Sequence, residues 1–544
     1  MKEAEDIGPE NKDPSIEITQ TQSVIQQCFC EAKKEKKKNR IVMNVMNTQY
    51  NVVRKVAKKV FHFKLSYAIS NDWDIFWADY GITPEMLSKM KSYQKVNHFP
   101  AIYCLARKEN LAKNLMRMKK IYPKEYNFFP VTWCIPRDYN NLKVEFSKGK
   151  TYIVKPEASC QGNGIYLIRS IEELDSNEHY VVQKYIKNPY LIDGLKFDIR
   201  IYILVYGCDP LRIYIHKQGL ARLATEKYEA PTKNNIENVY MHLTNYAINK
   251  NSENFLFNKN SEEADIGHKR SLESVWSYID LHGGNSEVVQ RRIRRCIVKS
   301  LCAVQPHLSH SYRSCQPSDI ENNMCFEILG YDIMLDSNLK PWLLEVNHAP
   351  SFETDTPFDH KVKYELIADT IKILHVSYKN RLRYNQQKQE EYNAKVLGKT
   401  VAKISKETRE ELRRQAMEVR DKYECKHLGN YTRIYPDPKM NTKYEEYIAE
   451  ANKAWNEFYG FNKRVQDNKE KSGLSPSTKK LPPVKARQGR TEVKSHAISK
   501  LAAPNRFCVS YAERKLQMTP VVNMNDPLNF LGTKNDTKLY SSNV

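Results

Sequence analysis

The stretch that decides the fold is CFEILGYDIMLDSNLKPWLLEVNHAPSF, residues 325–352. It predicts a hairpin, because two apolar runs flank a polar turn of Asp, Ser and Asn. Side chains two apart on a strand face the same way, so Glu345 and Asn347 are expected to point together. The opposite face of that strand is expected to carry Trp342, Leu344 and Val346.

Asp332 lies on the facing strand of this hairpin, where we expect it opposite Glu345 and Asn347. Two carboxylates and an amide oxygen that converge form an all-oxygen site. Such a site suits Mg²⁺ when phosphate oxygens complete the coordination shell. The alternative is an ordinary hairpin whose polar side chains face water, and the hairpin alone leaves both interpretations open.

Length and composition bound the class of protein. The 544 residues are enough for about three to four domains. No apolar run is long enough to span a bilayer, and the polar N-terminus is not a secretory signal. The 12 cysteines form no C-x-x-C pair, which favours free thiols in a reducing cytosol. We expect a monomeric cytoplasmic chain with no membrane partner.

The net charge of +22 predicts a polyanionic partner. Charge alone does not choose between nucleic acid, an anionic membrane and an acidic protein surface. The chain carries no zinc finger, no aromatic RNA-binding signature and no helix-turn-helix punctuation, which argues against nucleic acid.

Composition shifts along the chain predict six regions. A polar leader ending in KKEKKKNR and a tail rich in Pro, Ser, Lys and Asn are expected to be disordered. Between them lie three globular segments and a charged helical segment, which is either a solvated helix with i, i+4 ion pairs or, as we favour, a cationic arm that docks on an acidic surface. The predicted bounds are 1–40 for the leader, 41–100, 101–190 and 191–378 for the globular segments, 379–460 for the helical segment and 461–544 for the tail.

A glycine-containing loop precedes the hairpin in TYIVKPEASCQGNGIYLI, residues 151–168. This stretch predicts strand, loop and strand, with Lys155 ending the first strand and Gly162 and Gly164 in the loop. Glycines let backbone N–H groups approach phosphate oxygens, and a nearby lysine can neutralise those oxygens. Such a glycine pair is also typical of a simple hairpin turn, and its spacing is not that of a P-loop.

The next strands offer further ligand groups. VVQKYI, residues 181–186, can present backbone groups to a purine edge. GLKFDIRIYILVY alternates, so Lys196, Asp198 and Arg200 share a face that is costly to bury without partners. That order of charges matches ribose hydroxyls and a triphosphate. Arg222 and the polar cluster MHLTNYAINK add to this inventory.

In sequence order these motifs resemble the ATP-grasp ligases. The motifs KP, QGNGI, QKYI, KFDIRIY, HLTNYAINK, YDIMLD and WLLEVNHAPSF resemble the tubulin tyrosine ligase-like family, over about residues 70–375. CDPLRIYI, GLARLAT and EVNHAPSF are most similar to the tubulin polyglutamylases that elongate glutamate chains. The resemblance implies an α+β fold, with an ATP-grasp-like core of mixed and antiparallel sheets. The segment after residue 379 is similar to the microtubule-binding extension of those members.

The resemblance also implies roles for individual residues. The implied catalytic residues are Arg200, Arg222 and Glu345, and the implied Mg²⁺ ligands are Asp332, Glu345 and Asn347. The implied ATP contacts are Lys155, the loop residues Gln161, Gly162, Gly164 and Ile165, the strand residues Gln183, Lys184, Tyr185 and Ile186, and Lys196, Asp198, Thr244 and Asn245. The implied contacts for free glutamate or for the acceptor are Arg222, Tyr246, Lys250 and His348.

One residue departs from the family pattern. Asn163 stands in the glycine loop where the chain-elongating members carry arginine. The missing charge weakens the phosphate or acceptor contacts that the resemblance implies for this loop.

The implied function is ATP-dependent polyglutamylation of tubulin. A glutamate carboxylate of a tubulin C-terminal tail would be phosphorylated to an acyl phosphate with the help of Mg²⁺, and the amine of free L-glutamate would then attack it. The acidic tails would be the polyanion that the net charge predicts. Family habit implies microtubules, and the cilium or basal body, as the location. The alternatives are a glycine or tyrosine ligase of the same fold and a non-catalytic microtubule-binding protein.

Overall fold

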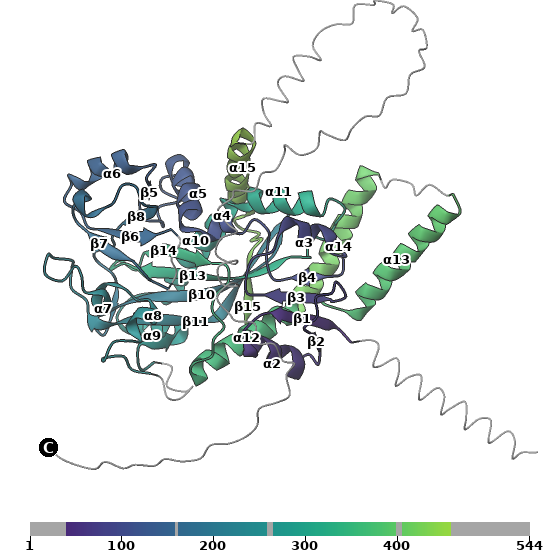
Figure 1. Cartoon of the computed structure of the whole chain (residues 1–544), viewed down its shortest axis with the longest axis horizontal. Helices are drawn as coiled ribbons and strands as arrows, with labels where there is room; N and C mark the ends of the chain where they lie inside the picture. Colours follow the sequence, from purple (N-terminus) through teal and green to yellow (C-terminus); the bar gives the residue numbers. More distant parts are fainter. Residues whose placement is uncertain (1–39, 158–160, 258–264, 399–404, 459–544) are drawn as a thin grey trace, which may run out of the picture. The chain divides into compact units, whose positions relative to one another are not determined.

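The computed structural model describes residues 40–157, 161–257, 265–398 and 405–458. These residues form three β-sheets that helices cover (Figure 1). The expected α+β class is therefore confirmed. The predicted disordered leader, apart from residue 40, and the predicted tail lie outside the described residues. Within the described part of the chain, every helix is too short or too polar to cross a membrane.

The first sheet is parallel and comes from the beginning of the described chain. Its strand order is β2-β1-β3-β4. Helix α2 covers the sheet with its buried valines, and Thr83 caps the start of α3, where its hydroxyl accepts a hydrogen bond from the Met86 N–H. The bounds are β1 Val42–Asn47, α2 Asn51–Lys59, β2 Lys64–Ser66, β3 Ile75–Ala78, α3 Pro84–Lys89 and β4 Lys95–Val96.

The second sheet is antiparallel, with the order β5-β8-β6-β7. Its own small core joins Leu142 of helix α6 to Val154 and Val182 of the central strands. The bounds are α4 Tyr103–Ala106, α5 Lys108–Ile121, β5 Thr132–Ile135, α6 Tyr139–Phe146, β6 Tyr152–Pro156, β7 Tyr166–Ile168, the 3₁₀ turn η1 Ile171–Glu173 and β8 Tyr180–Lys184.

The third sheet is the largest and follows the order β12-β11-β10-β13-β14, with β9 added to β10 and β15 added to β11. Along β10, Ile199 and Ile201 pack in a core with α10 and α11, whereas Tyr202 and Leu204 pack in a core with α12 and α2. Both faces are covered, which explains why nearly every residue of this strand is buried. The strand bounds are β9 Leu191–Ile192, β10 Leu195–Cys208, β11 Leu211–Lys227, β12 Lys269–Ser271, β13 Phe326–Leu335, β14 Pro341–Asn347 and β15 Tyr431–Tyr435. The helix bounds are α7 Val239–His242, α8 Tyr246–Asn249, α9 Leu272–Leu281, α10 Ser286–Cys302, α11 Gln305–Cys315 and α12 Pro357–Ile373.

The predicted hairpin of residues 325–352 is the pair β13 and β14. The two strands are antiparallel, and their register places Asp332 opposite Glu345 and Gly330 opposite Asn347. The register shifts between Asp332 and Ile333, so one extra residue is accommodated on β14. The hairpin and the pairing of Asp332 with Glu345 are as the sequence predicts.

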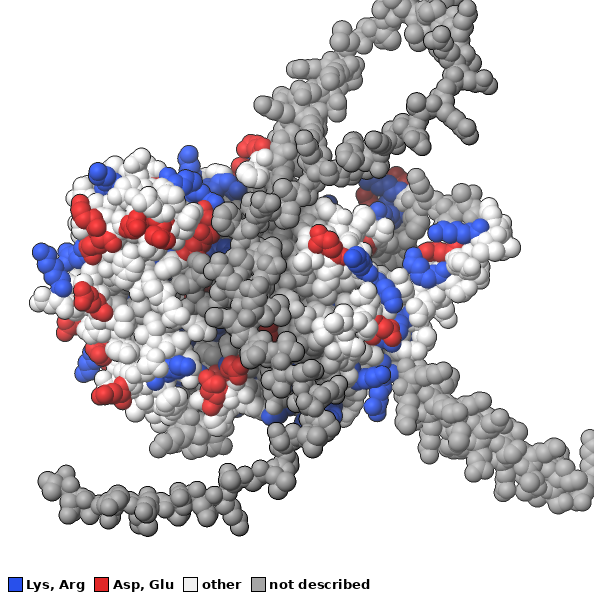
Figure 2. Space-filling model, viewed as in Figure 1, with Lys and Arg blue, Asp and Glu red and all other residues white. Residues whose placement is uncertain are grey.

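The chain after residue 378 does not remain outside the globular fold, although the sequence places the end of that fold there. Helices α13 (Tyr378–Val396) and α14 (Lys406–Lys426) are followed by β15, which pairs with β11, and by α15 (Asn441–Phe458), which packs on α10 and α11. Helix α13 buries none of its residues. On the face drawn in Figure 2, lysine and arginine side chains gather over α13 with a few carboxylates among them.

Candidate active site

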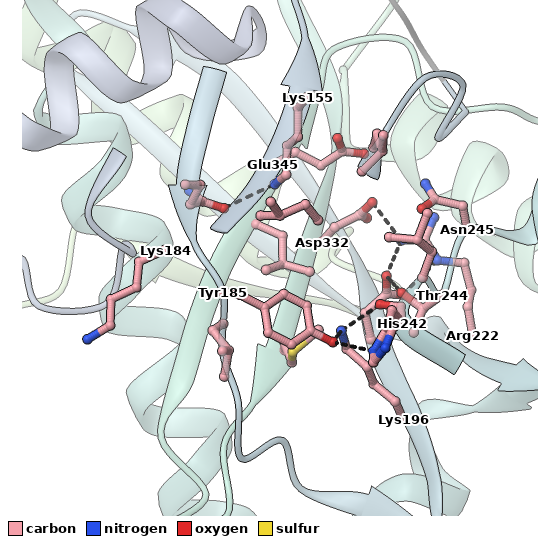
Figure 3. A pocket seen from close by; sticks show the side chains of 18 residues that line it. Lys155, Lys184, Tyr185, Lys196, Arg222, His242, Thr244, Asn245, Asp332 and Glu345 are labelled. Atoms are coloured by element: carbon pink, nitrogen blue, oxygen red, sulfur yellow. Dashed lines mark hydrogen bonds and ion pairs between the residues drawn. The ribbon is translucent and has the colours of Figure 1, made fainter. Parts of the chain in front are cut away.

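A pocket lined from both the second and the third sheet, which we call the central pocket, encloses about 620 Å³ of space between atoms, part of it open to solvent. Side chains from β6, β8, β10, β11, β13 and β14 line it, together with the segment between α7 and α8 (Figure 3). The implied ATP contacts among its lining residues are Lys155, Ile165, Gln183, Lys184, Tyr185, Ile186, Lys196, Asp198, Thr244 and Asn245.

Two buried lysines face the central pocket. The ammonium group of Lys155 donates to Oε1 of Gln183 at 3.0 Å, and that of Lys196 donates to the Tyr185 hydroxyl at 2.8 Å and to the His242 carbonyl at 2.7 Å. Burial lowers the pKa of Lys155 to about 8 and that of Lys196 to about 7. Neither lysine forms an ion pair with a carboxylate in the described part of the chain. Two desolvated ammonium groups without counter-ions suit an anionic ligand.

His242 completes the surroundings of Lys196. Burial, and then the charge of Lys196, lowers the pKa of His242 to about 4, so the imidazole is neutral at physiological pH. Its Nδ1 lies 3.1 Å from the Tyr185 hydroxyl, which therefore donates to it while accepting from Lys196. This relay holds the Lys196 ammonium in place at the pocket wall.

A network of charges lies beside the lysines. Arg222 donates two hydrogen bonds of 2.7 Å to the Asp198 carboxylate and a third of 2.7 Å to Asp332. Arg200 donates to both oxygens of Asp332, and Thr244 donates to Asp198 at 2.6 Å. The strand register creates these contacts, since Asp198 lies opposite Arg222 and Arg200 lies opposite Asp332. Burial opposes ionisation of Asp332, but Arg200 and Arg222 hold the pKa of its carboxyl well below the usual range.

Glu345 differs from the two aspartates because no described arginine or lysine forms an ion pair with it. Burial, followed by repulsion from Asp332, raises the pKa of the Glu345 carboxyl. Asn347 donates to Oε1 of Glu345 at 3.2 Å, so the three predicted Mg²⁺ ligands are brought together. A buried carboxylate without a cationic partner, beside a second carboxylate and an amide oxygen, fits a hard cation such as Mg²⁺. Asn347 lies beside the central pocket rather than among its lining residues.

The expected alternation along β14 is wrong at Leu344. This side chain lines the central pocket together with its neighbour Glu345, instead of pointing to the opposite face. The reason is the register shift between Asp332 and Ile333, because a bulge interrupts the period of two. Met334, two residues beyond Asp332, also lines the pocket, and that position follows from simple alternation.

The glycine loop approaches the central pocket at one point, beside Asn245. Gly162 has φ +89°, and a Cβ there would lie 2.7 Å from Cδ1 of Ile248 and 2.8 Å from Cγ of Asn245. Close packing against Asn245 and the positive φ both require glycine at this position. Gln161 and Gly164 are exposed and are not among the lining residues, whereas Ile165 is.

Three residues implied to contact glutamate or the acceptor lie outside the central pocket. The Tyr246 hydroxyl donates to Asp355 at 3.4 Å, and Lys250 lies 6.0 Å from the centre of the Tyr246 ring. His348 lines a separate small pocket, where its ring centroid is 6.0 Å from that of His98. Arg222 is the one residue of this group that lines the central pocket.

An α+β chain with buried lysines, an arginine–carboxylate network and a carboxylate hairpin around one pocket defines a fold of the ATP-grasp class. Residues 86–384 match the tubulin-tyrosine ligase family. The chain belongs to this family, as the motifs of the sequence predict.

Several curated proteins are similar to most of the chain. A probable beta-tubulin polyglutamylase of Tetrahymena thermophila is 50% identical over 440 residues, which cover 80% of this chain and 37% of that protein. Tubulin polyglutamylase TTLL6 of Mus musculus is 41% identical over 438 residues, covering 79% of this chain and 52% of that protein. Tubulin polyglutamylase TTLL7 of Homo sapiens is 36% identical over 448 residues, covering 77% of this chain and 50% of that protein. The chain thus spans about a third to a half of the length of these relatives.

Proposed function

We propose that the protein is an ATP-dependent tubulin polyglutamylase, which joins free L-glutamate to glutamate side chains or glutamate chains on tubulin C-terminal tails. The observation that carries the proposal is the pair of buried ammonium groups of Lys155 and Lys196, which face the carboxylate hairpin and form no ion pair with a carboxylate of the described residues. The names of the similar polyglutamylases support the choice of tubulin and of glutamate.

In this proposal the central pocket binds ATP as a cosubstrate. Lys155 and Lys196 neutralise phosphate oxygens, and the negative phosphates favour the charged ammonium groups that burial disfavours. Segment 183–186 holds the adenine, and Asp198 and Thr244 receive the ribose. The glycine loop covers the phosphates, and Gly162 approaches them from the side of Asn245.

The chemistry follows from the poor electrophilicity of a carboxylate. Phosphorylation of the acceptor carboxylate gives an acyl phosphate, and the amine of free glutamate displaces the phosphate to form an amide bond. Mg²⁺ bound by Asp332, Glu345 and Asn347 would offset charge on the phosphates during transfer. Arg200 and Arg222, which Asp332 and Asp198 hold in place, stabilise the oxyanion that forms when the amine attacks. The protein positions the substrates and neutralises the charge that develops on them, and the reaction needs no side-chain nucleophile.

The proposed partners and location follow from the same reaction. The acidic tubulin tails are both substrate and docking partner for a chain of net charge +22. We propose the cytoplasm, at microtubules, as the site of action. The segment 379–460 is proposed to contribute to microtubule binding, and Tyr246, Lys250 and His348 are proposed to meet glutamate or the acceptor from outside the central pocket.

The test is incorporation of labelled amino acids into tubulin by the purified chain with ATP. We expect glutamate to be incorporated, and Glu345→Gln to abolish incorporation while microtubule co-sedimentation is unchanged. Incorporation of glycine or tyrosine in place of glutamate would contradict the choice of amino acid. A wild-type chain as inert as Glu345→Gln would favour a non-catalytic microtubule-binding protein.

A further inference from the structure

A second cavity, which we call the lysine cavity, shares the segment 184–186 with the central pocket. It encloses about 880 Å³ of space between atoms, part of it open to solvent. Its walls come from the end of α5, the segment before β5, the segment after β8 and the turn between β13 and β14. Apart from segment 184–186, none of its lining residues has a role in the proposed reaction.

Three lysines line this cavity, and a fourth lies at its edge. Lys119 belongs to α5, and Lys184 and Lys187 lie at and beyond the end of β8. Figure 3 shows Lys184 directed away from the other side chains of the central pocket. At the edge, the Lys340 ammonium stacks 3.6 Å from the ring centre of Trp342. None of the four lysines forms an ion pair with a carboxylate of the described residues.

The carboxylate that lines the lysine cavity is already engaged. Asp336 accepts a hydrogen bond of 2.9 Å from the Trp342 indole N–H, and 3.0 Å bonds from the backbone N–H groups of Asn338 and Lys340. Its oxygens therefore hold the β13–β14 turn rather than a lysine. The cavity therefore has three lining lysines and one lining carboxylate, which forms no ion pair with any of them.

The like charges act on one another across the cavity. Lys119 is half-buried, and its ammonium group donates to the Phe129 carbonyl at 2.8 Å. Burial, and then repulsion from Lys340 and Lys184, lowers the pKa of Lys119 to about 8. A bound anion would stabilise the buried Lys119 ammonium group and would reduce its repulsion by Lys340 and Lys184.

We propose that the lysine cavity binds a small phosphate polyanion. Several lysines around one concave site match a ligand that carries several charges on one short chain, and Asn127, Asn188 and Ser337 supply neutral polar groups beside them. An acidic peptide fits less well. Residues of an extended peptide advance by about 3.3 Å and alternate in direction, so only every second carboxylate faces one cavity.

The experiment is calorimetric titration of the full chain with sodium tripolyphosphate at constant ionic strength and without divalent cations. Lys119→Gln and Lys187→Gln each remove one charge from the lysine cavity, and Lys187 is exposed, so its replacement leaves the fold intact. Lys120→Gln is the matched control, because Lys120 is exposed on the same helix and is not a lining residue. Lys155→Met reports binding in the central pocket.

We expect a saturable site whose Kd rises at least about fivefold in Lys119→Gln and in Lys187→Gln, as loss of one charge pair predicts. The site is retained in Lys120→Gln and in Lys155→Met. Three results would overturn the proposal: the absence of saturable binding, loss of all binding in Lys155→Met while Lys119→Gln binds normally, or tighter binding of a glutamate-rich peptide than of tripolyphosphate at the same lysines.

Discussion

Replacing Lys196 by methionine is expected to make the folded protein more stable and to abolish its binding of an anion in the central pocket. Burial lowers the pKa of this lysine from 10.5 to about 7. Each pH unit is equivalent to about 1.4 kcal/mol, so the charged ammonium lowers the free energy of unfolding by about 5 kcal/mol below pH 7. Methionine has a similar length and carries no charge.

The replacement also leaves polar partners behind. The Tyr185 hydroxyl and the His242 carbonyl each lose a hydrogen bond from Lys196, at a cost of about 1–3 kcal/mol in total. Lys196→Met is therefore expected to raise the free energy of unfolding by about 3 kcal/mol at pH 6. The same variant is expected to lose nucleotide binding, because the buried charge that destabilises the fold is also the charge that binds the phosphates.

The dependence on pH gives this prediction a definite sign. Below pH 7 both the folded and the unfolded chain hold the Lys196 proton, so the buried charge destabilises the folded chain by its full amount. Between about pH 7 and 10.5 the unfolded chain binds the proton and the folded chain does not, so the wild-type chain gains stability as pH rises. The advantage of Lys196→Met should therefore shrink steadily from pH 7 towards pH 10.

Urea unfolding at pH 6, 7.5 and 9.5 measures this difference directly. Lys120→Met is the control, since Lys120 is exposed and its replacement should change the free energy of unfolding by no more than about 0.5 kcal/mol. A variant less stable than wild type at pH 6, or an advantage of equal size at every pH, would refute the reasoning about the buried charge.

Two further substitutions test the arginine network and the glycine loop. Arg222→Lys keeps the charge but cannot hold Asp198 and Asp332 together with three hydrogen bonds, so we expect glutamate incorporation to fall at least about 100-fold; incorporation within a few-fold of wild type would contradict the role of the network. Gly162→Ala places a Cβ 2.8 Å from Cγ of Asn245 at φ +89°, so we expect nucleotide Kd, measured by calorimetry, to rise about tenfold. An unchanged Kd would show that the loop does not touch the ligand.

The sequence predicts well those parts of the site that lie on regular strands. Alternation along β10 places Lys196 and Asp198 on the face that lines the central pocket, as the structure has them. The polar turn predicts the β13–β14 hairpin, and with it the pairing of Asp332 with Glu345. These features depend on local periodicity, which a sequence displays directly.

The parts that were not predicted depend on irregular or distant contacts. The bulge at Leu344 contains no glycine or proline from which the sequence could predict it. Thr244 and Asn245 of the polar cluster line the central pocket, but helix α8 begins directly after them, and its first residue, Tyr246, lies against Lys269 and Asp355. Strand β15 is five residues in a highly charged region, and its place in the sheet comes from pairing with β11, more than 200 residues earlier in the sequence.

The place of β15 changes how the predicted cationic arm is tested. Truncation after residue 378 would be expected to weaken microtubule binding far more than ATP binding if the segment were only an arm. It would, however, also remove the strand that pairs with β11, and the buried pair of Arg420 and Glu424 on α14. Arg420 also donates to the backbone carbonyls of residues 206 and 321. Truncation therefore destabilises the third sheet, and any loss of binding would have two causes.

Helix α13 allows a cleaner test, because it buries none of its residues. Lys379, Arg383 and Lys395 are exposed and form no ion pair with a carboxylate of the described residues, so replacing all three by glutamine removes charge without breaking such a pair. If α13 docks on acidic tubulin tails, three lost charge pairs should weaken microtubule co-sedimentation about tenfold or more at low salt, and less at high salt.

The matched control neutralises three exposed lysines of α2 that follow the first strand. These are Lys55, Lys58 and Lys59. Both triple variants lower the net charge by the same amount, so a long-range effect of total charge acts on them equally. A larger loss of microtubule co-sedimentation in the α13 variant than in the α2 variant would place the contact on α13. The two variants have the same net charge, so only a local contact could make them differ. Equal losses would instead mean that tubulin senses the net charge of the protein and that α13 is a solvated helix.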